Sequence, residues 1–420
     1  MKKKLFLTLI ILFLPLAARG YFSLSKEVVI TNTVASVSPA PIDILEKIQK
    51  GILLLKSSPP LQYEMKKNKK GKLTDQLARK QIALAILNKN TGELFEKRVW
   101  IKEDEIQNYK KVGFISLESN ETIDPMVTPL KIRVKWFNSF NSFYEIGNRP
   151  ELVIVGNKYL LASDDLGNLP EKSKNKYTDI VYVPYSDALH SPELIAAGKK
   201  YIDANVNTAF TELTNKKVLS RSLTGHLVTD DIIKDFLKNI ILVEHMDPDS
   251  FGMALDGGKE LTDRVLIVIG ANQNLAYRYT GSPAGASGLA QFIKSTYVSM
   301  VSKYPEANLI KDYKQGMASH VNALEAMVLF FDTHAKEIKN KIVRRDIIEQ
   351  LGISEEMLAA AYNGGPSRVV TSINKYGIAW IDRQLDPVGP KTIFKKETID
   401  YIKKFQSVKK LNLFSNISVE

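Results

Sequence analysis

The chain has 420 residues, of which 44% are hydrophobic and 25% are charged, and its formal net charge is +12. This composition is that of a globular protein with its own hydrophobic cores, and it excludes a disordered or fibrous chain. The sequence contains no cysteine, which excludes disulfides, thiolate metal sites, a cysteine nucleophile and a lipoprotein anchor.

The first twenty residues have the pattern of a secretory signal peptide. A basic start, MKKK, precedes an uncharged apolar run from Leu5 to Ala17, and Ala18-Arg19-Gly20 follows as a small-x-small processing site. The run is shorter than the roughly 20 residues that span a bilayer, so we expect export followed by cleavage, with an uncleaved anchor as the alternative. Either way, the rest of the chain is expected to be periplasmic or secreted.

The positive charge predicts anionic partners. An exported basic protein is attracted to cell wall and to acidic lipid, so we expect contact with wall polymers and a peripheral association with the membrane. The lysines are scattered or in short pairs such as Lys403-Lys404. No basic stripe or known module marks a nucleic-acid-binding protein, so nucleic acid is not an expected partner.

The N-terminal half has two different sequence patterns. Residues 21–72 are weakly patterned and predict a linker or N-terminal arm with one short helix around Ile44 to Leu55. Residues 73–190 alternate apolar and polar side chains, most clearly over 131–137, 151–162 and 179–185, which predicts strands. We expect a β-rich or α+β accessory domain there, without chemistry of its own, as the place where an envelope protein partner would bind.

The C-terminal half has helical periodicity. Ser191 and a following proline begin it, and most runs from there to about Phe405 are typical of helices joined by Gly- or Pro-containing loops. The predicted fold class is therefore α+β, with a mainly helical domain over 191–408, a boundary between 190 and 226, and a tail over 409–420.

One acidic residue continues an apolar helix face. A helix is predicted from Asp231, and its apolar side chains recur at three- and four-residue spacing. These side chains are Ile233, Phe236, Leu237, Ile240 and Ile241. Glu244 extends the same face, and a carboxyl held against apolar surface has a raised pKa and can donate a proton near neutral pH. That property suits glycosidic bond cleavage. The alternative is a helix end that turns into solvent.

Three further motifs follow in order: SPAGASGLAQF (282–292), AAAYNGGPSRV (359–369) and KETIDYIKKF (396–405). With the upstream glutamate, they resemble the catalytic domain of soluble lytic transglycosylases, a lysozyme-like fold. The matching positions are Ser282, Gly285, Ala286, Gly288, Leu289, Gln291, Thr296, Ala361, Tyr362, Asn363, Gly365, Glu397, Thr398 and Tyr401. The resemblance covers roughly 226–408, under half of the chain.

The resemblance implies a role for each site residue. Glu244 is the catalytic residue, Tyr362 holds its carboxyl through the phenol hydroxyl, and Asn363 reaches the sugar. Ser282, Gly288, Gln291 and Tyr401 bind or position the glycan, while Glu397 is either a brace or a substrate contact. From the residues themselves, Gly285 and Gly288 permit close approach of a polysaccharide and of the catalytic helix. Gln291 can both donate and accept hydrogen bonds to amino sugars. A phosphate cradle is disfavoured because Lys294 comes too late after the glycines.

The implied reaction breaks the β-1,4 bond between N-acetylmuramic acid and N-acetylglucosamine in peptidoglycan. Glu244 would protonate the glycosidic oxygen and then deprotonate the muramyl C6 hydroxyl, which closes a 1,6-anhydro ring, and no cofactor or metal is needed. One alternative is a hydrolytic muramidase on the same fold, with Asp247, Asp249 or Asp256 as a second carboxylate. The other is a non-catalytic wall-binding scaffold.

The sequence departs from the family pattern at three points. His245 stands where serine usually follows the glutamate, Ala290 replaces the usual methionine, and 44 residues separate Glu244 from Gly288. The extra segment is predicted to add a loop and a helix over the cleft. It also makes Glu260 a competing catalytic assignment, although Glu260 follows LDGGK and is expected to begin a helix in water. The absence of H-E-x-x-H and of G-x-S-x-G from the sequence disfavours a zinc amidase or a serine peptidase.

Overall fold

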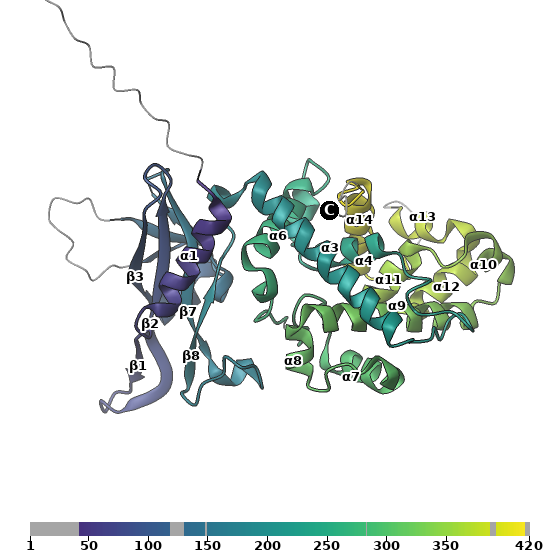
Figure 1. Cartoon of the computed structure of the whole chain (residues 1–420), viewed down its shortest axis with the longest axis horizontal. Helices are drawn as coiled ribbons and strands as arrows, with labels where there is room; N and C mark the ends of the chain where they lie inside the picture. The colour runs from purple at the N-terminus through teal and green to yellow at the C-terminus, as the bar shows by residue number, and fades with distance from the viewer. Residues whose placement is uncertain (1–41, 118–129, 148, 283, 387–391, 416–420) are drawn as a thin grey trace, which may run out of the picture. The chain divides into compact units, whose positions relative to one another are not determined.

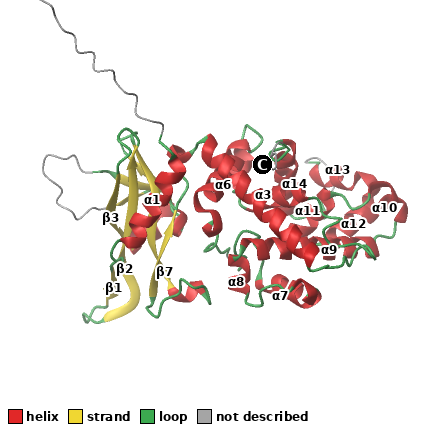
Figure 2. Ribbon diagram, in the orientation of Figure 1, coloured by secondary structure: helices red, strands yellow, loops and turns green. Residues whose placement is uncertain are grey.

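The computed structural model describes residues 42–415 except 118–129, 148, 283 and 387–391. The predicted signal peptide and residues 21–41 of the predicted arm lie outside the described residues. An N-terminal sheet region precedes a helical C-terminal region (Figures 1 and 2), so the predicted α+β class is confirmed. None of the helices in the described part of the chain is long and apolar enough to cross a membrane.

A five-stranded antiparallel sheet organises the N-terminal half, in the order β1-β2-β7-β8 with β3 paired to β2. Its strands are β1 (Tyr63–Lys67), β2 (Leu73–Asn88), β3 (Leu94–Lys102), β7 (Leu152–Ala162) and β8 (Tyr177–Tyr182). Successive side chains of a strand point to opposite faces, and both faces of β2 are buried. Ile82, Leu84 and Ile86 join one core, whereas Ala83 and Leu87 join a second core on the other face.

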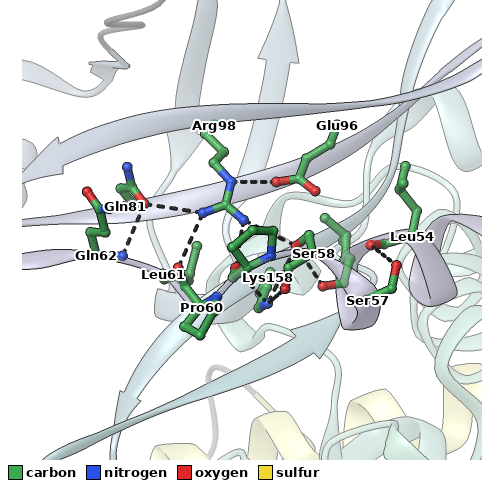
Figure 3. A network of polar contacts seen from close by, with 12 residues as sticks. Leu54, Ser57, Ser58, Pro60, Leu61, Gln62, Gln81, Glu96, Arg98 and Lys158 are labelled. Carbon is green, nitrogen blue, oxygen red and sulfur yellow. Dashed lines mark hydrogen bonds and ion pairs between the residues drawn. The ribbon is translucent and has the colours of Figure 1, made fainter.

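The helix α1 (Ile44–Ser57) covers the second face of the sheet (Figure 1). The segment that follows α1 is fixed by two basic side chains (Figure 3): Arg98 of β3 donates to the Pro59 carbonyl at 2.6 Å, and Lys158 of β7 donates to the Ser58 carbonyl at 2.9 Å. The short helix predicted around Ile44 to Leu55 is confirmed as α1. The rest of the predicted arm needs correction where β1 pairs with β2 in the sheet. Because β1 is an exposed edge strand with lysines, it lacks the alternation of apolar and polar side chains that marks most strands in a sequence.

A smaller antiparallel sheet follows β3. The helix α2 (Glu103–Val112) leads to the strands β4 (Ile115–Leu117), β5 (Ile132–Trp136) and β6 (Phe143–Ile146), with β5 in the centre. Ile132 and Val134 of β5 are buried in the first core while Trp136 at its end is exposed. This sheet thus presents an aromatic side chain at the point where β5 turns into the following loop.

Helices form the rest of the described chain. They are α3 (Pro192–Asn215), α4 (Lys234–Glu244), α5 (Pro248–Met253), α6 (Lys259–Asn272), α7 (Lys294–Lys303), α8 (Tyr313–Ala318), α9 (His320–Lys341), α10 (Arg345–Leu351), α11 (Glu355–Gly364), α12 (Pro366–Tyr376), α13 (Trp380–Leu385) and α14 (Lys396–Lys410). The proline at the first position of α3 and the Ser191 cap agree with the sequence pattern. The predicted tail needs correction, because α14 continues to Lys410 and Phe414 is buried in the core.

The two halves share a hydrophobic core, and the described residues, which begin at 42, form one compact unit. A buried amide joins them: Asn272 at the end of α6 accepts from the Val183 N–H and donates to the Val183 carbonyl, both at 2.8 Å. The predicted boundary near residue 190 therefore marks a change of secondary structure inside one unit and not a break between independently packed domains.

Candidate functional site

Glu244 is the last residue of α4. The buried face of this helix holds Phe236, Leu237, Ile240 and Ile241 at the predicted spacing. Ile233 is exposed because it precedes the helix as its cap residue. Glu244 itself is only partly buried, so its carboxyl lies at the border between the core and the surface.

Helix α14 supplies the groups that surround the Glu244 carboxyl. The Tyr401 hydroxyl donates to Glu244 Oε1 at 2.6 Å. The Lys404 ammonium donates to the carbonyls of Val243 and Met246, both at 3.0 Å. These carbonyls lie at or just after the C-terminal end of α4, where a cation is favourable. Lys404 was missed by the sequence analysis, although it lies three residues after Tyr401 and therefore on the same helix face.

The environment sets the protonation of Glu244. Burial raises the pKa of Glu244 to about 7, even though the hydrogen bond from Tyr401 and the charge of Lys404 lower it, and the nearby Glu397 raises it further. Burial also lowers the pKa of Lys404. At neutral pH a fraction of the Glu244 carboxyl is therefore protonated, as a general acid requires.

Two cavities meet at Glu244. The smaller cavity, of about 390 Å³, lies against α14, and the larger cavity, of about 750 Å³, lies against α6 and the sheet half. Both are bordered by Glu244, Met246 and Pro248. Asn363, Glu397 and Tyr401 line the smaller cavity. Ser282 and Gln291 line the larger one. Most of the predicted site residues thus border two cavities that share Glu244. Other carboxyls lie there too: Asp249, Glu397 and Asp400 border the smaller cavity, and Asp247 borders the larger one.

Tyr362 does not hold the Glu244 carboxyl, contrary to the expectation from the resemblance. Its hydroxyl donates to the Ala290 carbonyl at 2.5 Å, and its ring packs against Phe292 and Phe331. Tyr362 therefore fixes the glycine-rich segment to α11, and the role expected of it falls to Tyr401. Next to it, Asn363 accepts a hydrogen bond from Thr398, which joins α11 to α14.

The two glycines of SPAGASGLAQF lie in different surroundings. Gly288 has a positive φ of 71°, and a Cβ there would lie 2.5 Å from the Met317 carbonyl. Gly285 also has a positive φ but faces open space. The expectation that Gly288 makes room for substrate and for α4 is therefore corrected: it makes room for α8. Gln291, also at positive φ, donates to the Gly288 carbonyl at 2.7 Å while bordering the larger cavity.

Two positions at which the sequence departs from the family pattern, His245 and Ala290, make contacts inside the fold. His245 stacks flat on Tyr277 with ring centroids 3.5 Å apart, and its ring N–H donates to the Leu289 carbonyl at 2.9 Å. Burial lowers the pKa of His245 to about 3, so the ring is neutral. Ala290 is fully buried. His245 therefore ties the end of α4 to the glycine-rich segment.

The extra segment between Glu244 and Gly288 forms α5 and α6. Parts of this segment border the cavities: Pro248 of α5 borders both, and Leu261 and Val265 of α6 border the larger one, while α6 also packs on α3. Glu260 lies at the exposed start of α6 and pairs with Arg264 at 2.5 Å. Asp256 accepts backbone N–H groups at the same helix start, whereas Asp247 and Asp249 border the cavities.

A scan against protein-family models found no match for this chain, and a search of the curated proteins found none either.

Proposed function

We propose that this chain is an exported lytic transglycosylase that cleaves the β-1,4 bond between N-acetylmuramic acid and N-acetylglucosamine in peptidoglycan. The observation that carries the proposal is the Glu244 carboxyl, whose pKa burial raises to about 7 and which lies where two cavities meet. The order of the motifs adds support, since Ser282, Gln291 and Asn363 border those same cavities.

In the first step the protonated Glu244 gives its proton to the glycosidic oxygen as the bond to C1 breaks. The acetamido group of the substrate stabilises the positive charge that develops at C1. In the second step the Glu244 carboxylate takes the proton of the muramyl C6 hydroxyl, and that oxygen bonds to C1. The Tyr401 hydroxyl, 2.6 Å from Oε1, stabilises the carboxylate between the two steps. One acidic residue therefore completes both proton transfers.

Product masses test this proposal. Purified peptidoglycan digested with the wild-type protein should give muramyl fragments about 18 Da lighter than hydrolysis products, because no water is added. Fragments at the hydrolysis mass would instead establish a muramidase, for which Asp247 or Asp249 at the cavity border could hold a water. Binding to the wall without any fragment would favour a scaffold protein.

The pH dependence provides a second prediction. Because Glu244 must start protonated, kcat/KM should fall as the pH rises above about 7. The hydrogen bond from Tyr401 lowers the pKa of Glu244, so Tyr401→Phe should move this decline to higher pH and reduce kcat by about 10- to 100-fold. Rates measured from pH 4 to pH 9 for both proteins check the direction, and an unchanged or lower pH of decline in Tyr401→Phe would contradict the assignment.

The location and the partners belong to the same proposal. Residues 1–20 have the pattern of an export signal, and the hairpin of β1 and β2 carries exposed lysines at 67, 69, 70 and 72. Positive charge of this kind attracts anionic wall polymers and acidic lipid headgroups, more weakly at high salt. The sheet half remains the proposed binding place for an envelope protein partner.

A further inference from the structure

The larger cavity extends from Glu244 to the sheet half of the molecule. On that side it is bordered by Trp136 at the end of β5, by Asn138 and Asn141 in the following loop, and by Phe143 and Tyr185. Glu244 and Gln291 border the same cavity. Side chains from the β-rich half thus share one depression with the proposed catalytic carboxyl.

Three aromatic side chains, which we call the aromatic rim, form this border: Trp136, Phe143 and Tyr185. Trp136 and Phe143 are directly opposite each other on β5 and β6, so their side chains project to the same face of the sheet. The Phe143 and Tyr185 rings follow with centroids 6.0 Å apart. Trp136 is 49% exposed. A tryptophan that leaves this much of its ring in water inside a cavity is available to a ligand.

Polar groups accompany the aromatic rim. Asn138 and Asn141 each carry an amide that can donate and accept, and Oδ1 of Asn141 is buried without a hydrogen-bond partner among the described residues. Arg264 of α6 lies over the Tyr185 ring at 5.1 Å and holds it in place. Flat apolar rings next to amides match a pyranose, which has an apolar C–H face and a polar edge of hydroxyl and acetamido groups.

We propose that the aromatic rim binds an N-acetylated amino-sugar unit of the glycan strand, beyond the bond that is cleaved at Glu244. This inference rests on the proposed function and extends it, because it makes the sheet half part of the substrate site. The occupant is an oligosaccharide and not a protein partner, since the rim is continuous with the cavity that contains Glu244. Trp136 is the principal contact, as the most exposed aromatic of the three.

Binding in the absence of turnover tests the aromatic rim. In a Glu244→Gln background, hexameric N-acetylglucosamine is titrated in a calorimeter and its Kd is compared among variants. Trp136→Ala should bind about ten-fold more weakly, whereas Trp136→Phe, which keeps an aromatic face, should retain most of the affinity. Trp100→Ala is the matched control, because Trp100 lies on β3 against Arg79, away from the residues that border the cavity.

Fluorescence gives an independent measurement. The chain has three tryptophans, of which Trp380 is buried. Hexamer binding to the Glu244→Gln protein should therefore quench or shift the tryptophan emission. The change in emission should be much smaller in the Glu244→Gln, Trp136→Phe double variant. If Trp136→Ala binds the hexamer with unchanged affinity, the aromatic rim is not a glycan-binding site. Cleavage of the wall by the wild type would still support the proposed function in that case. If hexamer binding depends on Trp136 but the wild type does not cleave peptidoglycan, the glycan-binding role of the rim is supported and the transglycosylase activity is rejected.

Discussion

The Glu244→Gln protein should lose turnover of purified peptidoglycan, with kcat lower by about 10³-fold or more. General acid–base catalysis by one residue contributes about 10²- to 10⁴-fold, and here the same carboxyl performs both proton transfers. Glutamine has nearly the same shape and can still accept the hydrogen bond from Tyr401, but it can neither give up nor take a proton at neutral pH. The measurement is the rate of 1,6-anhydro product formation by mass spectrometry.

The stability of the same variant separates lost chemistry from lost folding. The pKa of Glu244 is raised on folding, to about 7, so the folded state is favoured at low pH and loses stability as the pH rises through 7. Glutamine removes this loss, and Glu244→Gln should melt at or above the wild-type temperature at pH 8. Glu260→Gln, at the exposed competing position, should keep wild-type activity. Full activity in Glu244→Gln, or its loss in Glu260→Gln, would reject the assignment.

The sequence predicted the part of the site that depends on local periodicity. The apolar spacing in α4 placed Glu244 at the end of a buried face, and the structure has it there. Which tyrosine holds the carboxyl depends on how α11 and α14 pack against α4, and no spacing within one helix contains that information. For this reason Tyr401, and not Tyr362, holds the Glu244 carboxyl. Lys404 was missed because lysine side chains normally face water.

The same limit applies to the fold. Long alternating runs such as β7 were recognisable, whereas β1, with three charged residues in five, was not. The extra segment has helical periodicity, but only tertiary contacts decide that α6 packs on α3 and joins Val183. The aromatic rim was also beyond the sequence, since Trp136 and Glu244 are separated by more than a hundred residues and meet only through the shared cavity.

The crossing of α3 and α6 should be the most sensitive point for stability. A Cβ at Gly198 would lie 2.1 Å from the Leu266 carbonyl oxygen, and one at Gly270 would lie 2.3 Å from the Leu194 carbonyl oxygen. Both obstacles are backbone atoms of the facing helix, so a methyl group must push the two helices apart. Gly198→Ala should therefore lower the free energy of unfolding by about 3 kcal/mol, measured as a lower urea midpoint with an unchanged m value.

The matched control for this crossing is Gly252→Ala in α5. Gly252 has an ordinary φ and nothing within 4 Å of the added methyl, so this alanine should leave the stability unchanged or raise it slightly. Because Val265 and Val268 of α6 border the larger cavity, Gly198→Ala should also weaken hexamer binding, by displacing this part of the cavity wall. Equal urea midpoints for Gly198→Ala and Gly252→Ala would mean that α3 and α6 are not in the close contact on which the shape of the cavity depends.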